Sequence, residues 1–204
     1  MLASSTIIQD IDTMRRAGLL SLAFFYFDFR EEKKKGLRGL VSSLLVQLCR
    51  QSDYYHDRLF KFYLEHAPGF HCPSDDTLVG CLKDLLKLPG LAPVYIIVDA
   101  LDECPNIPAV RSPRQEVLNL IELLIKSQFP NLRICVTSRP ETNIKDILDP
   151  LTFRPVSLPS EPGHRKDIMS YIKLVINMHP KSRMWQEEHK QLVIEVLTKN
   201  AYGR

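Results

Sequence analysis

The chain has 204 residues, of which 45% are hydrophobic and 25% are charged, and its formal net charge is +3. This composition is typical of a soluble globular protein with one ample core, alone or with a small appendage. The charge is too small to indicate binding to nucleic acid, and no apolar run approaches the roughly 18 residues of a membrane span. We therefore expect neither nucleic acid nor a membrane as a partner.

The cysteines indicate the cellular setting of the protein. There are five of them, an odd number, and no two form a C-x-x-C pair. Cys49, Cys81 and Cys135 fall inside apolar patterns that predict helices or strands. Such cysteines are typical of a reduced protein, so we expect a cytoplasmic location.

In the first half of the chain, the sequence pattern predicts one strand with helices before and after it. Apolar residues at helical spacing predict a helix over residues 2–16, which ends near Gly18. Residues 20–29, LSLAFFYFDF, are apolar on both faces and predict a buried strand. Helical spacing returns over residues 37–49 and continues over 54–66.

The second half alternates between strands and helices. Asp75 or Asp76 is expected to cap a helix over residues 77–87. The run VYIIV, residues 94–98, predicts a buried strand, and EVLNLIELLIK, residues 116–126, predicts an apolar helix. Another buried strand is predicted in LRICVTSRP, residues 132–140.

The last part of the chain predicts one more strand and then helices. FRPVSL, residues 153–158, predicts a strand, and helices are expected over about 165–178 and 185–199. Strands that alternate with helices favour an α/β fold, in which a mostly parallel sheet is flanked by helices. Ligands of such sheets bind beyond the carboxyl ends of the strands.

Two predicted strand ends carry polar residues suited to phosphate chemistry. Asp99 follows VYIIV directly and could bind Mg²⁺, which needs only one or two protein carboxylates. Asp102 or Glu103 could orient or deprotonate an attacking water. Arg139, which follows RICVTS, could bind a terminal phosphate through its planar fork. Turn capping by the aspartates and simple charge balance by the arginine are the structural alternatives.

These segments resemble a known family. VYIIVDALDEC resembles the Walker B segment of NACHT-type nucleotide-binding domains, and RICVTSRPE resembles their sensor 1 strand. The blocks STIIQDI, LAFFYFDFR, LVSSLLVQL and LTKNAYGR extend the similarity to the nephrocystin-3-like NACHT domains of fungal NLR-like (STAND) proteins.

The resemblance implies a fold, a cofactor and partners. The implied protein is a P-loop NTPase with a three-layer α/β core over residues 1–160 and the start of a helical lid region over 161–204. It would bind ATP or GTP with Mg²⁺, switch between two states in signal transduction, and associate with other NACHT domains as a homo-oligomer. Asp99 would bind the metal, Asp102 and Glu103 would act on water, and Arg139 would sense the terminal phosphate.

One essential part of such an enzyme is missing from the sequence. The phosphate-binding loop G-x-x-x-x-G-K-[ST] occurs nowhere in the 204 residues, and neither does the strand that precedes it in the family. We therefore expect a fragment that lacks the Walker A segment, hydrolyses no nucleotide and leaves unpaired strand edges in its sheet. The alternatives are a non-catalytic module that binds a complete NACHT protein, for example by accepting its strand at the open sheet edge, and an inactive gene-model fragment.

Overall fold

The structure is a computed structural model that describes residues 2–65, 72–88, 92–108, 112–157, 164–179, 182 and 184–200. The chain forms two compact units, Met1–Leu151 and Thr152–Arg204. In the described parts of the chain, no helix has the length and apolar character needed to cross a membrane.

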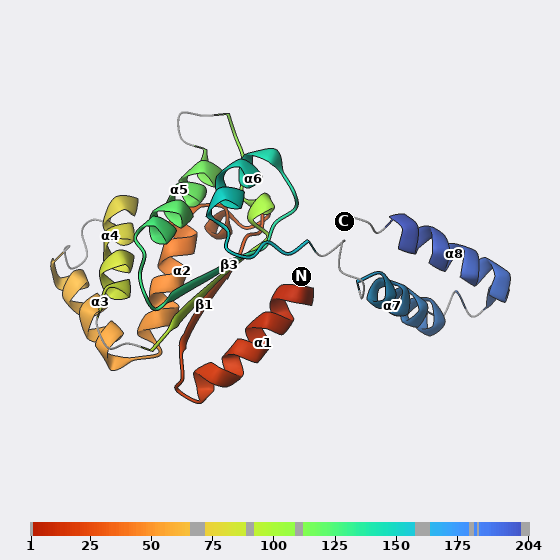
Figure 1. Ribbon diagram of the computed structural model, residues 1–204, viewed down its shortest axis with the longest axis horizontal. Coiled ribbons are helices and arrows are strands. Elements are labelled where there is room, and N and C mark those ends of the chain that lie inside the picture. Colours follow the sequence, from red (N-terminus) through yellow and green to blue (C-terminus); the bar gives the residue numbers. More distant parts are fainter. Residues whose placement is uncertain are drawn as a thin grey trace. The chain divides into compact units, whose positions relative to one another are not determined.

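A parallel sheet of three strands forms the centre of the first unit (Figure 1). The strands are β1 (Ser21–Tyr26), β2 (Val94–Asp99) and β3 (Leu132–Val136), in the spatial order β1-β2-β3. The register pairs Tyr26 with Asp99 and Val98 with Val136, so the carboxyl ends of the strands lie at one edge of the sheet. The predicted α/β class, a parallel sheet flanked by helices, is confirmed.

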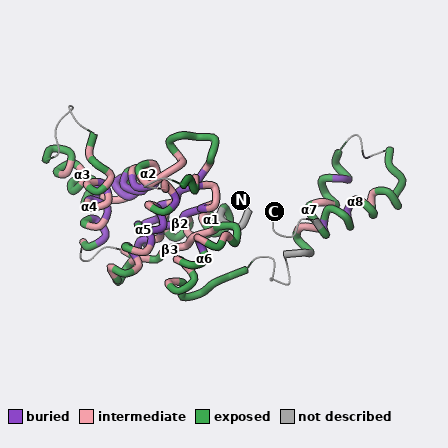
Figure 2. Tube along the Cα trace, turned by 90° about the horizontal axis from the view of Figure 1, so that it is seen from above, coloured by how far each residue is buried: buried purple, intermediate pink, exposed green. Residues whose placement is uncertain are grey.

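Helices cover both faces of the sheet because side chains alternate between the faces along each strand. On one face, Leu22 and Ile97 pack against α1 (Leu2–Arg16). On the other face, the sheet packs against α2 (Leu37–Cys49), α4 (Asp75–Leu86) and α5 (Pro113–Lys126). Figure 2 shows that the buried residues concentrate in the strands and in the helices of this second face.

Smaller helices complete the first unit. α3 (Asp53–Glu65) follows α2, and α6 (Thr142–Leu148) follows β3. Short 3-10 helices lie at Glu32–Lys34 (η1), Leu101–Glu103 (η2) and Asp149–Leu151 (η3). The second unit consists of α7 (His164–Met178) and α8 (Glu187–Asn200), which pack on each other and bury Ile176 and Ile194.

Two details of the predicted elements are wrong. Residues 153–157 form no strand, and the apolar side chains that predicted one are not buried: Phe153 is fully exposed and Val156 largely so. Residue 158 and the predicted helix residue 66 lie outside the described residues. The cap of α4 is Ser74, whose hydroxyl accepts from the Thr77 N–H at 3.2 Å, whereas Asp75 and Asp76 lie inside the first turn.

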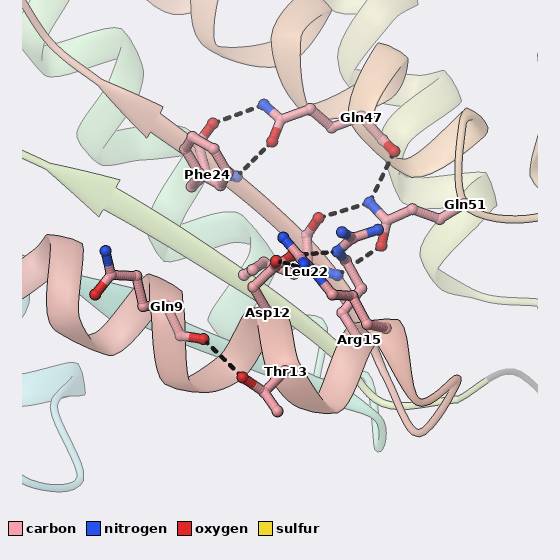
Figure 3. A network of polar contacts seen from close by, with 9 residues as sticks. Gln9, Asp12, Thr13, Arg15, Leu22, Phe24, Gln47 and Gln51 are labelled. Atoms are coloured by element: carbon pink, nitrogen blue, oxygen red, sulfur yellow. Dashed lines mark hydrogen bonds and ion pairs between the residues drawn. The ribbon is translucent and has the colours of Figure 1, made fainter.

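Two glutamine side chains close the free edge of β1 (Figure 3). The Gln47 amide accepts from the Phe24 N–H at 3.0 Å and donates to the Phe24 carbonyl at 2.7 Å. The Gln51 amide makes the same pair of bonds with Leu22, at 2.9 and 2.6 Å. Gln47 lies on α2 and Gln51 lies four residues further on, in the turn after the helix ends. Their amides therefore match the two-residue repeat of the strand and take the place of a neighbouring strand at Leu22 and Phe24.

Replacing Gln47 by leucine tests this edge closure. We expect Gln47→Leu to lower the free energy of unfolding by about 1–3 kcal/mol, because it leaves two backbone groups of Phe24 unpaired. Gln115→Leu, on the exposed surface of α5, is the matched control and should change stability by no more than about 0.5 kcal/mol. Urea unfolding measures both, and equal effects would show that the Gln47 amide contributes nothing.

Gly39 allows α2 to begin close to η1. A Cβ atom at Gly39 would lie 2.0 Å from the Lys33 carbonyl oxygen, whereas a Cβ atom at Gly80 in α4 would meet nothing within 4 Å. We expect Gly39→Ala to destabilise the fold by about 1–3 kcal/mol through this overlap. Gly80→Ala should instead stabilise it by up to about 1 kcal/mol through helix propensity. Thermal unfolding distinguishes them, and two changes of the same sign would contradict the packing described.

Candidate functional site

The candidate site lies where β2 and β3 end. Asp99 is the last residue of β2 and is only 5% exposed, although it carries a carboxylate. Buried carboxylates need hydrogen-bond partners because desolvation disfavours their charge. The partner in this structure comes from the neighbouring strand end.

Thr137 joins the Asp99 carboxylate to the end of β3. Its hydroxyl donates to Asp99 Oδ1 and accepts from the Ala100 N–H at 3.2 Å. The backbone continues the link, because the Thr137 N–H donates to the Val98 carbonyl at 2.9 Å and its carbonyl accepts from the Leu101 N–H at 3.0 Å. Thr137 thus fixes both the Asp99 side chain and the start of the next turn.

The charge of Asp99 acts on side chains of the same sheet face. Burial raises the pKa of the Tyr26 phenol above its usual value, and the Asp99 carboxylate raises it further, while a hydrogen bond with Ser5 of α1 opposes the rise. The pKa of the Cys135 thiol is raised for the same two reasons, with burial the larger. Both groups therefore remain neutral next to the carboxylate at neutral pH.

The backbone turns sharply after Asp99. Ala100 has φ 55° and ψ 46°, the left-handed conformation, which costs a residue with a Cβ atom roughly 1–2 kcal/mol. The turn leads directly into η2, which carries Asp102 and Glu103. Backbone strain of this kind is found preferentially where a fold holds functional groups in place.

Asp102 and Arg139 are in contact across the two strand ends. The Arg139 N–H donates to Asp102 Oδ1 at 3.0 Å, and Arg139 Nε lies 3.4 Å from Asp102 Oδ2. The Asp102 side chain is 9% exposed, whereas that of Arg139 is 67% exposed. The carboxylate is thus held in the turn while the guanidinium extends toward solvent and has room to change partners.

The end of β1 adds a positive charge near Glu103. Arg30 follows β1 and pairs with Asp28 at 2.8 Å. Hydrogen bonds from Arg30 lower the pKa of Asp28 to about 2. The pKa of Arg30 is raised mainly by Asp28, and Glu103 contributes to the same rise. Glu103 therefore lies within the electrostatic reach of a third strand end, which the sequence did not indicate.

Cys104, the last residue of the DALDEC segment, has a structural role and not a chemical one. The buried thiol donates to the Lys35 carbonyl at 3.2 Å, and burial raises its pKa to about 12. A thiol with so high a pKa is a poor nucleophile because it carries almost no thiolate at neutral pH. Its contact with Lys35 instead ties the turn after β2 to the segment before α2.

The oxygen atoms of the site fit a hard cation better than a transition metal. In the described part of the chain, no three His, Cys, Asp or Glu side chains gather into a metal-binding group. Mg²⁺ does not need such a cage, because it keeps several waters and binds through one or two carboxylates plus the phosphates of its substrate. The Asp99 carboxylate with the adjacent Thr137 hydroxyl is an oxygen donor set of that kind.

The structure brings most of the predicted site residues to one place. Asp99, Asp102 and Arg139 lie at the adjoining ends of β2 and β3, and Glu103 lies on the same turn as Asp102. The sequence patterns assigned no separate role to Thr137 and did not single out Arg114 or Glu141. The buried Arg114 guanidinium forms an ion pair beside the turn with Glu141, whose side chain is 43% exposed. The predicted helix begins at residue 116, whereas α5 begins at Pro113 and places Arg114 in its first turn, where a cation opposes the helix dipole.

The fold and the site define an α/β protein whose parallel strands gather carboxylates and an arginine at their carboxyl ends. The sequence matches the family described as nephrocystin 3, N-terminal, over residues 1–139. The chain belongs to this family. No curated protein and no solved structure matches it.

Removing the Thr137 hydroxyl tests the link between the strand ends. We expect Thr137→Val to lower the free energy of unfolding by about 1.5–3 kcal/mol, because a buried carboxylate loses a hydrogen-bond donor. Thr137→Ser keeps the hydroxyl and loses one methyl group, a loss of about 0.8 kcal/mol or less. If denaturant unfolding gives the two variants the same stability, the hydroxyl does not support Asp99 as described.

Proposed function

We propose that this chain supplies the metal and water side of a nucleotide-binding site, in a domain that acts as a nucleotide-dependent switch. The observation that carries the proposal is the buried Asp99 carboxylate, held by Thr137 next to the contact between Asp102 and Arg139. Asp99 would bind Mg²⁺, and Asp102 with Glu103 would orient the attacking water. Bound Mg²⁺ would neutralise charge on the phosphates.

Arg139 is suited to sense a terminal phosphate. Its guanidinium is largely exposed and now lies beside Asp102 at 3.4 Å. A phosphate offers the guanidinium a bidentate partner with more charge than one carboxylate. Its arrival would draw Arg139 away and release the Asp102 carboxylate to act on water. The presence of a terminal phosphate would thereby be coupled to the state of Asp102.

Membership of the nephrocystin 3, N-terminal, family supports this proposal. The more specific features that follow are part of the proposal. We infer a NACHT-type P-loop NTPase core, with ATP or GTP as nucleotide, signalling of the NLR-like kind, and association with further NACHT domains. Since the 204 residues contain no G-x-x-x-x-G-K-[ST] loop, the amides and lysine that bind phosphates most strongly are not among them. We expect these residues by themselves to bind nucleotide weakly and to hydrolyse none.

Titration of the purified chain with Mg·ATP and Mg·GTP tests the proposal. We expect weak binding, in the millimolar range, that requires Mg²⁺ and is lost in Asp99→Ala and reduced in Arg139→Ala. Arg133→Ala is the matched control, because Arg133 is an exposed arginine near the start of β3, whereas Arg139 follows the end of that strand. Isothermal calorimetry or a fluorescent nucleotide measures the affinity.

Three results would contradict the proposal, and the first is that neither Mg·ATP nor Mg·GTP binds at all. Equal losses in Arg139→Ala and Arg133→Ala would indicate general attraction of phosphate to positive charge. Micromolar affinity that depends on Asp99 would show that the chain holds phosphate without the loop, and would overturn the inferred weak binding.

The open edge of β3 favours a second candidate function, a module that accepts a strand from a partner protein. The Asn131 carbonyl and the Thr137 N–H bond to β2. Because backbone groups alternate along a strand, those of Ile134 and Val136 face away from β2, toward the outer edge of the sheet. Within the described residues, no strand pairs with that side, and the β3 side chains are only partly buried. Strand addition to such an edge is a common mode of peptide recognition. Mg²⁺-dependent nucleotide binding that needs Asp99 would favour the first candidate.

A further inference from the structure

Arg114 is a charged residue in an unusual position. It is the second residue of α5 and is only 5% exposed. A cation in the first turn opposes the helix dipole, and a buried charge is costly unless it is paired and hydrogen-bonded. The contacts of the guanidinium explain why an arginine is found there.

The guanidinium holds the turn that follows β2. Arg114 Nε donates to the Cys104 carbonyl at 2.8 Å, and Nη2 donates to the Asp102 carbonyl at 2.6 Å. The backbone adds a third bond, from the Arg114 N–H to the Pro105 carbonyl at 3.1 Å. Residues 102–105 are therefore fixed by one side chain and its own backbone.

The remaining edge of the guanidinium reaches the turn that follows β3. Arg114 Nη1 donates to the Glu141 carboxylate and forms an ion pair with it. Glu141 is itself held near Arg139, because its N–H donates to the Arg139 carbonyl at 2.8 Å. It also precedes α6, where its carbonyl accepts from the N–H groups of Ile144 and Lys145 at 3.1 and 3.0 Å. One buried side chain thus joins the two turns that carry Asp102 and Arg139.

We propose that Arg114 is a positioning residue of the site. Through its bonds to the turns after β2 and β3, it sets the distance between the Asp102 carboxylate and Arg139. The inference rests on the proposed nucleotide site and names a residue that would not touch the nucleotide, because its guanidinium is buried. Arginine suits this role because its planar fork donates in several fixed directions at once, whereas a lysine ammonium is a point charge on a flexible stem. Arg114→Lys keeps the charge and removes the fork.

The backbone N–H of Arg139, which donates to Asp102 Oδ1 at 3.0 Å, reports on this positioning. In nuclear magnetic resonance spectra of the complete chain, its proton should resonate downfield because the acceptor is a carboxylate. Asp102→Ala defines the position of the signal when the bond is absent. We expect Arg114→Lys to move the signal toward that position, with the downfield shift largely lost, while the rest of the spectrum remains that of the folded protein.

A control in the same helix separates positioning from plain destabilisation. Ile121 is a buried core residue of α5, and Ile121→Val should weaken the fold without moving the Arg139 signal.

Glu141→Gln keeps the arginine and its two carbonyl bonds but removes the charged link to the second turn. It should shift the signal in the same direction as Arg114→Lys, and it provides the test if Arg114→Lys does not fold.

The inference is overturned if Arg114→Lys or, where that variant does not fold, Glu141→Gln leaves the Arg139 signal at its wild-type position. It is also overturned if Ile121→Val moves the signal as far as they do. The readout needs no nucleotide, so a failure of Mg·ATP to bind would refute the proposed function and leave this measurement unaffected. Where nucleotide does bind, Arg114→Lys should weaken the response to Mg·ATP in the way that Arg139→Ala does.

Discussion

The hydrogen bond from the Thr137 hydroxyl to the Asp99 carboxylate is the contact on which the site depends. It allows a carboxylate to remain at the buried end of β2, where an unpaired charge would be costly. It also joins β2 to β3 beyond the last paired residues of the sheet, so that the turn carrying Asp102 starts from a fixed point. The strained backbone at Ala100 follows from the same constraint, since the chain must leave the sheet at once to bring η2 against the end of β3.

The two edges of the sheet are treated in different ways. Gln47 of α2 and Gln51 just after it bond the outward backbone groups of Phe24 and Leu22, which covers most of that edge. β3 forms the other edge of the sheet and is only partly buried. The residues that follow β3 lead directly into the site. The polar chemistry of the domain therefore lies beside the edge at which the sheet can still grow. A strand added there would lie next to the turn that holds Arg139.

Local patterns were sufficient to predict much of the fold. The signals for β2, β3, α2 and α5 are local, because each apolar run or helical spacing lies within one short segment. β1 is apolar throughout because the fold covers both faces of the sheet. The strand expected at residues 153–158 is wrong over residues 153–157, because the fold leaves the apolar side chains of Phe153 and Val156 exposed. The order of motifs along two strands also indicated that Asp99, Asp102 and Arg139 belong together.

What sequence could not provide were contacts between distant residues. Gln47 is an ordinary helix residue in the sequence and Gln51 an ordinary residue after that helix, and their role depends on how α2 docks on the sheet. Arg114 and Glu141 are 27 positions apart and read as surface charges until the fold buries one of them. Thr137 appears as one of several polar residues after a strand, and only the register of β2 and β3 places its hydroxyl on Asp99.

We propose that the ends of β2 and β3 form one site for a metal-bound phosphate. Paramagnetic broadening of backbone amide signals by Mn²⁺ with ATP tests it most directly, because the effect falls steeply with distance from the metal. We expect early broadening at Ala100, Thr137 and Arg139, little change at Leu22 and Phe24 on β1, and loss of this pattern in Asp99→Ala. Broadening that spares the ends of β2 and β3, or that persists unchanged without the Asp99 carboxylate, would contradict it.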